Sequence, residues 1–224
     1  MVSPQSLVPR FFNNTADTYD KIVAWTTFGK DNLWKKEILS QISTGQSFLD
    51  LGCGTGILTR KIAQKFPLAK IIGIDLTQSY LKIAERNSSS YKNITFIHQD
   101  AEKISLDTKF DCMVSSYVPK YCSPQILVKK CVEHLNPGGK IILHDFTYPK
   151  NKAVRALWNF YFVILNFVGN FMPTWKDAFS ELPKLIRKSE WSTLYEKELA
   201  SHGFTVEIQR HTWNCASILI ATRT

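Results

Sequence analysis

Residues Phe48 to Gly56 read FLDLGCGTG, and this stretch decides the fold class of the chain. A short apolar strand runs into three glycines at alternate positions, and a helical pattern follows from Ile57. Glycine lets the backbone turn sharply and lets a ligand approach the main chain, while a helix N-terminus supplies free N–H groups. The spacing G-x-G-x-G differs from the G-x-G-x-x-G of dinucleotide-binding enzymes. The stretch therefore predicts a ligand-binding turn between a buried strand and a helix.

Short apolar segments alternate with amphipathic ones downstream of this turn, which is typical of a parallel sheet with helices on both faces. The expected strands cover 47–51, 70–74, 94–98, 110–115 and 140–143, the last preceded by a turn at 136–139. The expected helices cover 57–66, 78–87, 124–135 and 190–201. Two further strands, 204–210 and 214–221, are joined so tightly that they must be antiparallel. We predict one doubly wound α/β domain, Rossmann-like, with a mostly parallel seven-stranded sheet and an antiparallel C-terminal hairpin.

Two segments stand outside this alternation. Residues 1–45 are expected to form a helical cap, and 151–188 a helical insertion interrupted by Pro173 and Pro183. Within the insertion, 156–172 is a run of 17 residues without charge, at the lower limit for a membrane span. Asparagines at 159, 166 and 170 would share one helix face and break the uniform apolarity that lipid demands. We therefore expect a lid over the site, although a span remains the alternative.

The composition of the chain limits its possible binding partners and its cellular compartment. The formal net charge of +9 suits an anionic partner such as nucleic acid or acidic lipid, and the alternative is simple solvation of the surface. The five cysteines include no C-x-x-C pair, which argues against a disulfide framework or a zinc site and suits a reducing cytosol. Residues 1–10 lack the apolar core of a signal peptide. We expect a cytoplasmic protein without a metal.

Acidic residues occur at the ends of the first three expected strands, where ligands bind open α/β sheets. Asp50 precedes the glycines and can anchor the turn or face an ammonium group. Asp75 can accept both hydroxyls of a ribose, and its alternative role is to cap the next helix. Asp100 can accept a hydrogen bond from an exocyclic amino group while the backbone of Ala101 reaches a ring nitrogen. Solvation of a loop is the alternative for Asp100.

These features resemble the class I S-adenosylmethionine-dependent methyltransferases, over a core from Gln46 to Ala221 that includes the segment LNPGGKIIL. In that family the glycine loop holds the methionine end of the cofactor, the acid after strand two the ribose, and the acid after strand three the adenine. The resemblance implies S-adenosylmethionine as cofactor. The expected contacts come from the ends of the first four strands: Asp50, Gly52, Gly54, Gly56, Asp75, Leu76, Asp100, Ala101 and Ser116.

A closer resemblance is to the ubiquinone/menaquinone C-methyltransferases. The opening segment keeps a Tyr19-Asp20 pair, and the insertion ends in the similar stretch AFSELPKLIRKSEW. The similarity implies methylation of a small lipophilic acceptor, with a quinone precursor favoured. The chain departs from the family after strand four, where an Arg-Asn pair is usual and Lys120 and Tyr121 stand instead. Lysine keeps the charge but loses the planar fork of arginine.

Four side chains are candidates for the chemistry on the acceptor: Tyr19, Lys120, His144 and Asp145. Tyr19 is expected to close the cofactor pocket. Lys120 can orient an acceptor oxygen, with a surface charge as the alternative. His144 and Asp145 follow strand five, and His144 can act as a general base or simply pack at the strand end.

Two other functions compete with this one. RNA methylation would use the positive charge, but the D/N-P-P-Y/F motif of amino-group methyltransferases is replaced here by SSYVPK, so nucleic acid is not the expected partner. A non-catalytic scaffold that binds S-adenosylmethionine is the third possibility. We also expect the insertion to touch an anionic membrane surface. A stripe of Trp158, Phe162, Leu165 and Val168 is flanked by basic residues.

Overall fold

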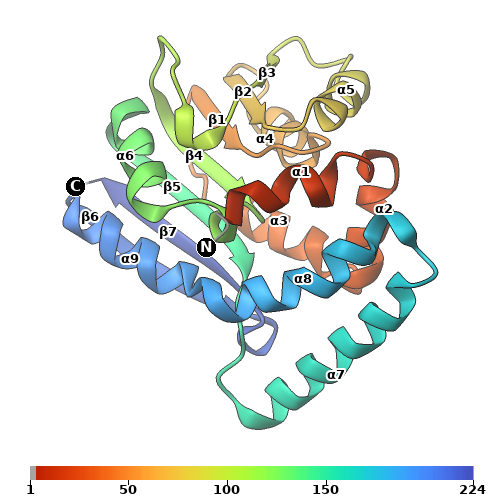
Figure 1. The fold of residues 1–224 in the computed structure, drawn as a ribbon. Helices are drawn as coiled ribbons and strands as arrows, with labels where there is room; N and C mark the ends of the chain where they lie inside the picture. The colour runs from red at the N-terminus through yellow and green to blue at the C-terminus, as the bar shows by residue number, and fades with distance from the viewer. Residues whose placement is uncertain (1–3, 224) are drawn as a thin grey trace.

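The computed structural model describes residues 4–223, which fold around a seven-stranded sheet of order β3-β2-β1-β4-β5-β7-β6. The first five strands pair in parallel, and β7 is antiparallel to both β5 and β6. Helices lie on both sides of the sheet, and the insertion extends beyond its carboxyl edge (Figure 1). This is the predicted doubly wound architecture with its antiparallel C-terminal pair.

Apart from β5, the strand bounds lie within two residues of the prediction, since the apolar runs that define the central strands are buried on both faces. The strands are β1 (Ser47–Leu51), β2 (Lys70–Asp75), β3 (Ile94–His98), β4 (Phe110–Ser116), β5 (Leu135–Phe146), β6 (Phe204–His211) and β7 (Ala216–Arg223). The helices are α1 (Leu7–Phe12), α2 (Ala16–Thr26), α3 (Lys30–Ser40), α4 (Ile57–Lys65), α5 (Gln78–Asn87), α6 (Pro124–His134), α7 (Lys152–Gly169), α8 (Pro173–Ser189) and α9 (Trp191–Ser201).

Alternate residues of the central strands enter two separate cores, as the period of two along a strand requires. On β1, Leu49 packs with α6 and α9 on one face, where Trp191 and Tyr195 are fully buried. Its neighbour Phe48 packs with α3 and α4 on the other face, against Ile38 and other apolar side chains. Because both faces of the central strands are covered, ligands can reach the sheet only at its ends, and open α/β sheets bind ligands at the carboxyl edge.

The start of β5 differs from the prediction. Residues 136–139 were expected to form a turn before the strand, yet β5 begins at Leu135 and includes them. The register with β4 jumps from Phe110↔Leu135 to Cys112↔Lys140, so one residue of β4 faces four of β5. The four residues therefore bulge out of the ladder, with Gly138 at a φ of 71°. The turn residues were identified correctly, but β4 and β5 pair both before and after them.

The insertion consists of the long helices α7 and α8, which pack side by side, with α7 outermost (Figure 1). Pro173 begins α8, a position where the missing N–H costs nothing. The expected interruption at Pro183 is wrong, because α8 continues through this buried proline. Across residues 4–223, no helix combines the length and apolarity needed to cross a bilayer.

Candidate active site

The glycine turn after β1 opens a cavity at the carboxyl edge of the sheet, with about 700 Å³ of empty space that includes its solvent-open side. All three glycines have left-handed backbone conformations, from 56° to 77° in φ. Gly52 and Gly54 line the cavity. A Cβ at Gly52 would lie 2.2 Å from Val118 Cγ2, whereas one at Gly54 would meet nothing closer than Tyr80 Cδ1 at 3.7 Å. The backbone of Gly54 is therefore free to touch a ligand.

Asp75 is one of the polar residues that line this cavity. Its Oδ2 accepts the backbone N–H of Gly54 at 2.8 Å, and its Oδ1 accepts that of Thr77 at 2.8 Å. Burial raises the pKa of the Asp75 carboxyl, and the two backbone N–H groups oppose that rise. The capping role and a ligand-binding role are compatible, since each carboxylate oxygen can accept a second hydrogen bond.

Asp50 and Gly56 lie behind the loop and outside the cavity lining. Asp50 Oδ2 accepts the hydroxyl of Thr59 on α4 at 2.6 Å, and burial raises the pKa of Asp50 to about 6. A Cβ at Gly56 would lie 3.1 Å from Ala84 Cβ, so this glycine allows α4 and α5 to approach. Of the two roles expected for Asp50, the structure shows the anchoring one.

The helical N-terminal segment closes the opposite side of the cavity through hydrogen bonds, three of which are 2.8 Å or shorter. Gln5 Nε2 donates to Asp100 Oδ1 at 2.6 Å, and Thr15 Oγ1 lies 2.8 Å from Tyr80 Oη. The third bond links Thr55 Oγ1 in the glycine loop to Asp20 Oδ1 at 2.7 Å. The bonds reach the loop after β3, the first turn of α5 and the glycine loop, so the segment is positioned by elements that also form the cavity. Leu76, Ala101 and Ser116, for which the sequence predicts contact with the cofactor, also line it.

A second, larger cavity of about 1810 Å³, its open mouth included, lies between the N-terminal helices and the insertion. Its wall is almost entirely apolar and aromatic, and Trp158, Phe162 and Leu165 of α7 contribute to it. Four residues line both cavities and form a shared wall: Phe12, Tyr19, Tyr117 and Tyr121. Burial holds the pKa of the Tyr19 phenol well above its usual value, so this side chain stays protonated at neutral pH.

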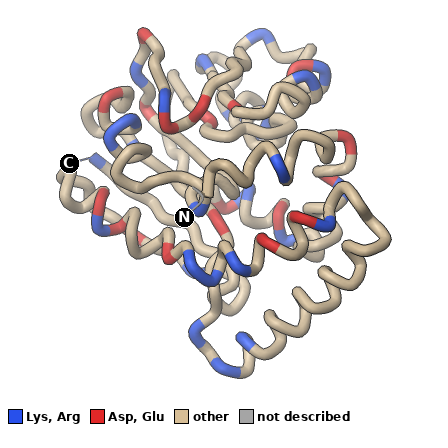
Figure 2. Tube along the Cα trace, viewed as in Figure 1, with Lys and Arg blue, Asp and Glu red and all other residues tan. Residues whose placement is uncertain are grey.

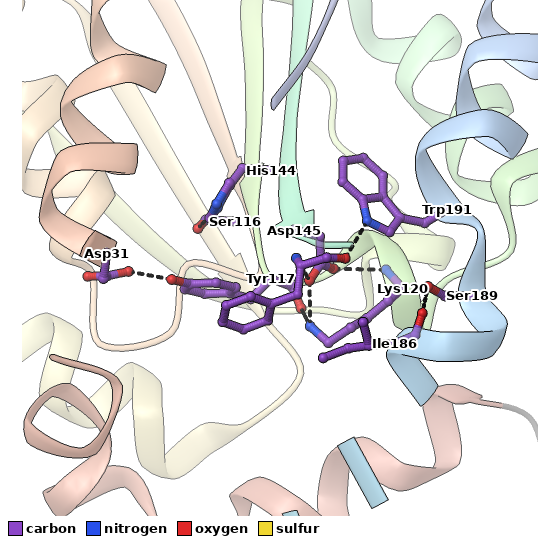
Figure 3. Close-up of polar contacts among 10 residues, drawn as sticks. Asp31, Ser116, Tyr117, Lys120, His144, Asp145, Ile186, Ser189 and Trp191 are labelled. Carbon is purple, nitrogen blue, oxygen red and sulfur yellow. Dashed lines mark hydrogen bonds and ion pairs between the residues drawn. The ribbon is translucent and has the colours of Figure 1, made fainter. Parts of the chain in front are cut away.

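Lys120 enters the larger cavity from the segment after β4 and pairs with Asp145 at the end of β5 (Figure 3). The Nζ–Oδ1 distance is 2.9 Å, and Nζ also donates to the carbonyl of Tyr117 at 2.6 Å. The other carboxylate oxygen accepts the backbone N–H of Lys120 at 3.0 Å. Burial lowers the pKa of Lys120 while the pairing with Asp145 opposes it. The surface-charge alternative for Lys120 is therefore wrong.

His144 lies behind the shared wall and does not line either of these two cavities. Its Nδ1 lies 2.9 Å from Ser116 Oγ, while its buried Nε2 has no hydrogen-bond partner among the described residues. Burial holds the pKa of His144 well below its ordinary value, and nearby Lys35 and Lys120 lower it further. His144 is thus a neutral ring packed at the strand end, and it contacts the cavity linings through Ser116 and the ring of Tyr117.

A buried network that the sequence did not indicate holds Tyr117. The Tyr117 hydroxyl donates to Asp31 Oδ1 on α3 at 2.8 Å, and Lys35 pairs with the same carboxylate (Figure 3 shows the Tyr117–Asp31 bond). Tyr117 has a φ of 71°, a rare conformation for a residue with a side chain. The buried face of α3 carries Asp31, Trp34, Lys35 and Ile38 at helical spacing, and this pattern was the available signal.

Comparisons with known proteins agree with this geometry. The model of the ubiE/COQ5 methyltransferase family matches residues 1–223. Demethylmenaquinone methyltransferase of Lactococcus lactis is 26% identical over 228 residues, covering 96% of this chain and 89% of that protein. The ubiquinone/menaquinone biosynthesis C-methyltransferase UbiE of Haemophilus ducreyi is 29% identical over 192 residues, covering 82% and 74%.

Among solved structures, magnesium protoporphyrin IX methyltransferase from Synechocystis with bound SAH superposes with a TM-score of 0.71 at 18% identity. The match covers 98% of this chain and 100% of that one, and it supports the fold. With a family model that spans the described chain, the resemblance first read from the glycine turn is confirmed. The chain belongs to the ubiE/COQ5 methyltransferase family and is an S-adenosylmethionine-dependent methyltransferase.

Proposed function

We propose that this enzyme methylates a ring carbon of a quinone-type acceptor, in its reduced or phenolic form, that carries a lipophilic tail. The observation that carries the proposal is the apolar cavity behind the shared wall, which adjoins the cofactor cavity and is large enough for a ring with part of a tail. The names of the relatives support the same acceptor class. A polar acceptor such as RNA would find few hydrogen-bond partners in this lining.

The residues of the smaller cavity fit S-adenosylmethionine. Asp75 retains acceptor capacity for ribose hydroxyls, and Gly54 exposes its backbone beside it. Asp100 Oδ1 already accepts the N–H of Glu102 at 2.9 Å and the Gln5 amide, so its Oδ2 is the freer oxygen for an adenine amino group. When bound, the cofactor supplies an electrophilic methyl group on a sulfonium.

The chain's own contribution is to position the acceptor and to hold charge beside it. A ring carbon becomes nucleophilic when a neighbouring hydroxyl is deprotonated, so a cation near that oxygen favours the reactive form. Lys120 has three N–H donors and uses two of them on the carbonyl of Tyr117 and on Asp145. The third is available to the acceptor oxygen. Tyr19 and Tyr121 exclude water from the wall between the two cavities.

The distribution of charge supports this assignment over nucleic-acid binding. Figure 2 shows lysines and arginines spread over several helices and loops, with acidic residues among them. A nucleic-acid surface requires basic side chains concentrated along one face. In the view of Figure 2, α7 is basic at its start and uncharged beyond Arg155, which suits an apolar partner.

The test is a methylation assay on the full chain with S-adenosylmethionine carrying a labelled methyl group. The acceptor is a chemically reduced naphthoquinone with a short prenyl tail and no ring methyl. We expect label in a product that still reoxidises to a quinone, since C-methylation leaves both oxygens free, whereas O-methylation blocks reoxidation. A product that cannot reoxidise, or label found only in added RNA, would overturn the proposal. Bound cofactor without turnover on any acceptor would favour the scaffold.

A further inference from the structure

The outward face of α7 is an exposed apolar surface with no partner in the described chain. It consists of Leu157, Phe160, Val163, Ile164, Phe167 and Phe171, which are 65%, 64%, 66%, 45%, 64% and 73% exposed. We refer to these six residues as the outer face. Phe171 lies in the turn after α7, and at 100° per residue the other five fall within one third of the helix circumference. An exposed stripe of this kind, continuous over about three turns, marks a binding surface rather than scattered surface residues.

The outer face differs from the stripe expected from the sequence. Trp158, Phe162 and Leu165, which were expected to touch the membrane, point inward and line the larger cavity. The helix α7 is therefore apolar on two faces: one lines the larger cavity and the other is exposed. A line of asparagines, Asn159, Asn166 and Asn170, borders the outer face on one side. A polar border suits a helix that lies in an interface rather than one that crosses it.

The charges around α7 are of one sign. From Thr147 to Lys176 the chain holds three basic residues before the uncharged run, one after it, and no acidic residue. Lys150 and Lys152 are exposed at the start of α7. The nearest acids along the chain are already paired: Asp145 with Lys120 at 2.9 Å before this segment, and Asp177 with Arg10 at 2.6 Å after it. An uncompensated basic end beside an apolar face complements an anionic lipid surface.

The mouth of the larger cavity opens beside the same face. Phe28, Leu157 and Trp213 line that cavity and are also 78%, 65% and 76% exposed. They come from three separate parts of the chain, namely the α2–α3 turn, α7 and the β6–β7 turn. Phe28 and Trp213 have positive φ values of 51° and 54°, so unusual backbone conformations hold both rings at the rim. The rim is thus as apolar as the cavity that it surrounds.

We propose that the outer face of α7 seats the enzyme on an anionic bilayer surface, with the cavity mouth against the lipid. The helix lies in the headgroup region, the basic residues at its start contact lipid phosphates, and the exposed rings reach the acyl boundary. A tailed acceptor can then pass from the bilayer into the cavity without crossing water. This last step rests on the proposed function, whereas the seating itself does not.

The first experiment measures sedimentation of the full chain with vesicles of phosphatidylcholine, with and without phosphatidylglycerol. We expect binding to the anionic vesicles that weakens as salt rises. Phe160→Ser and Phe167→Ser should each lower the partition coefficient about tenfold, since a buried phenylalanine contributes well over a factor of ten. Neither residue lines the larger cavity. Leu68→Ser is the matched control, because Leu68 is 99% exposed and precedes the amino end of β2.

The contribution of the two exposed lysines at the start of α7 is tested in the same assay. Lys150→Gln and Lys152→Gln should each weaken binding to anionic vesicles about fivefold, while Lys92→Gln, an exposed lysine before β3, should have no effect. Parent protein that stays in the supernatant at low salt would overturn the proposal. So would a folded Phe160→Ser/Phe167→Ser variant that binds like the parent. If light scattering instead shows a dimer that this double variant dissociates, the outer face binds a second copy and the lipid assignment fails.

A second measurement separates the seating from the chemistry. The double variant should raise KM for a long-tailed acceptor held in vesicles and leave turnover of a short-tailed, dispersed acceptor unchanged. Vesicle binding without turnover of any quinone would leave the seating intact and overturn only the proposed function. Normal turnover of a quinone without vesicle binding would overturn the seating and leave the proposed function intact.

Discussion

The ammonium of Lys120 and the carboxylate of Asp145 form an ion pair of 2.9 Å in which the two side chains are 2% and 0% exposed. Neither charge has access to bulk water, so each depends on the other for compensation. The pair joins the segment after β4 to the end of β5, beneath the rings of Tyr117 and Tyr121. A structural role and a role on the acceptor are therefore combined in one lysine, and they can be separated experimentally.

Lys120→Met should lower the free energy of unfolding by about 3–5 kcal/mol, because it leaves a buried carboxylate unpaired. The double variant Lys120→Met/Asp145→Asn removes both charges and should recover most of that loss in urea denaturation. Turnover should stay low in the double variant while cofactor affinity stays near that of the parent, if Lys120 contacts the acceptor. A stable double variant with full activity would show that Lys120 has a structural role and no role on the acceptor.

Asp75→Ala should weaken cofactor binding by about 1.5–3 kcal/mol, since hydrogen bonds to a charged acceptor are lost. Part of this loss would come from the glycine loop, because Asp75 also accepts the N–H of Gly54. Isothermal titration calorimetry measures the change directly. Asp107→Ala, at an exposed carboxylate in the loop before β4, is the control and should bind normally. Unchanged affinity in Asp75→Ala would remove this residue from the cofactor site.

The raised pKa of Asp50 predicts that its contribution to folding stability decreases as pH rises, which is opposite to the behaviour of a carboxylate with a lowered pKa. Its pKa is about 6 in the folded protein against an ordinary value of 3.8, so the folded state holds the proton more tightly than the unfolded chain. The contribution of Asp50 to stability therefore falls as pH rises from about 4 to about 6, by about 3 kcal/mol in total, and then levels off.

Asp50→Asn lacks this titration while keeping an acceptor for the Thr59 hydroxyl. The difference in unfolding free energy between variant and parent should therefore grow in favour of the variant across the same pH range. Comparing the two proteins at each pH cancels the slopes contributed by all other carboxylates. A constant difference from pH 4 to pH 7 would show that the buried carboxyl is not perturbed.

Asp20→Ala should loosen the N-terminal helices over the cofactor, because the hydrogen bond from Thr55 in the glycine loop is lost. A loss of about 1 kcal/mol corresponds to about fivefold faster cofactor dissociation. Stopped-flow fluorescence with a displacing excess of ligand measures the rate. Asp17→Ala on the same helix is exposed and should leave the rate unchanged. Equal rates in the two variants would mean that this bond does not hold the segment closed.

The prediction from sequence succeeded where the signal is local. The strand, the glycine turn and the helix after it are adjacent in the chain, so β1 begins and ends at the residues expected. It failed at the start of β5, because turn residues do not reveal that pairing continues on both sides of a bulge. The Asp31–Tyr117 bond joins residues 86 apart. Asp31 and Lys35 look like an ordinary surface pair on a helix until the fold buries them.

The same limit applies to the insertion. Helical periodicity identified an amphipathic segment, but α7 is apolar nearly all round, and periodicity alone cannot tell which stripe faces the protein. Trp158 and Phe162 proved to face the cavity, and Phe160 and Phe167 to face outward. Only the position of α8 against one side of α7 distinguishes the two.

The wall shared by the two cavities has a thermodynamic consequence. Phe12, Tyr19, Tyr117 and Tyr121 belong to both linings, so a ligand that shifts one of these rings in either cavity alters the shape of the other. Cofactor and acceptor affinities are then linked, and linkage is reciprocal: the factor by which one ligand tightens the other is the same in both directions. Binding of the methyl donor thus changes the affinity for the acceptor, and the reverse, through four aromatic side chains before any bond is made.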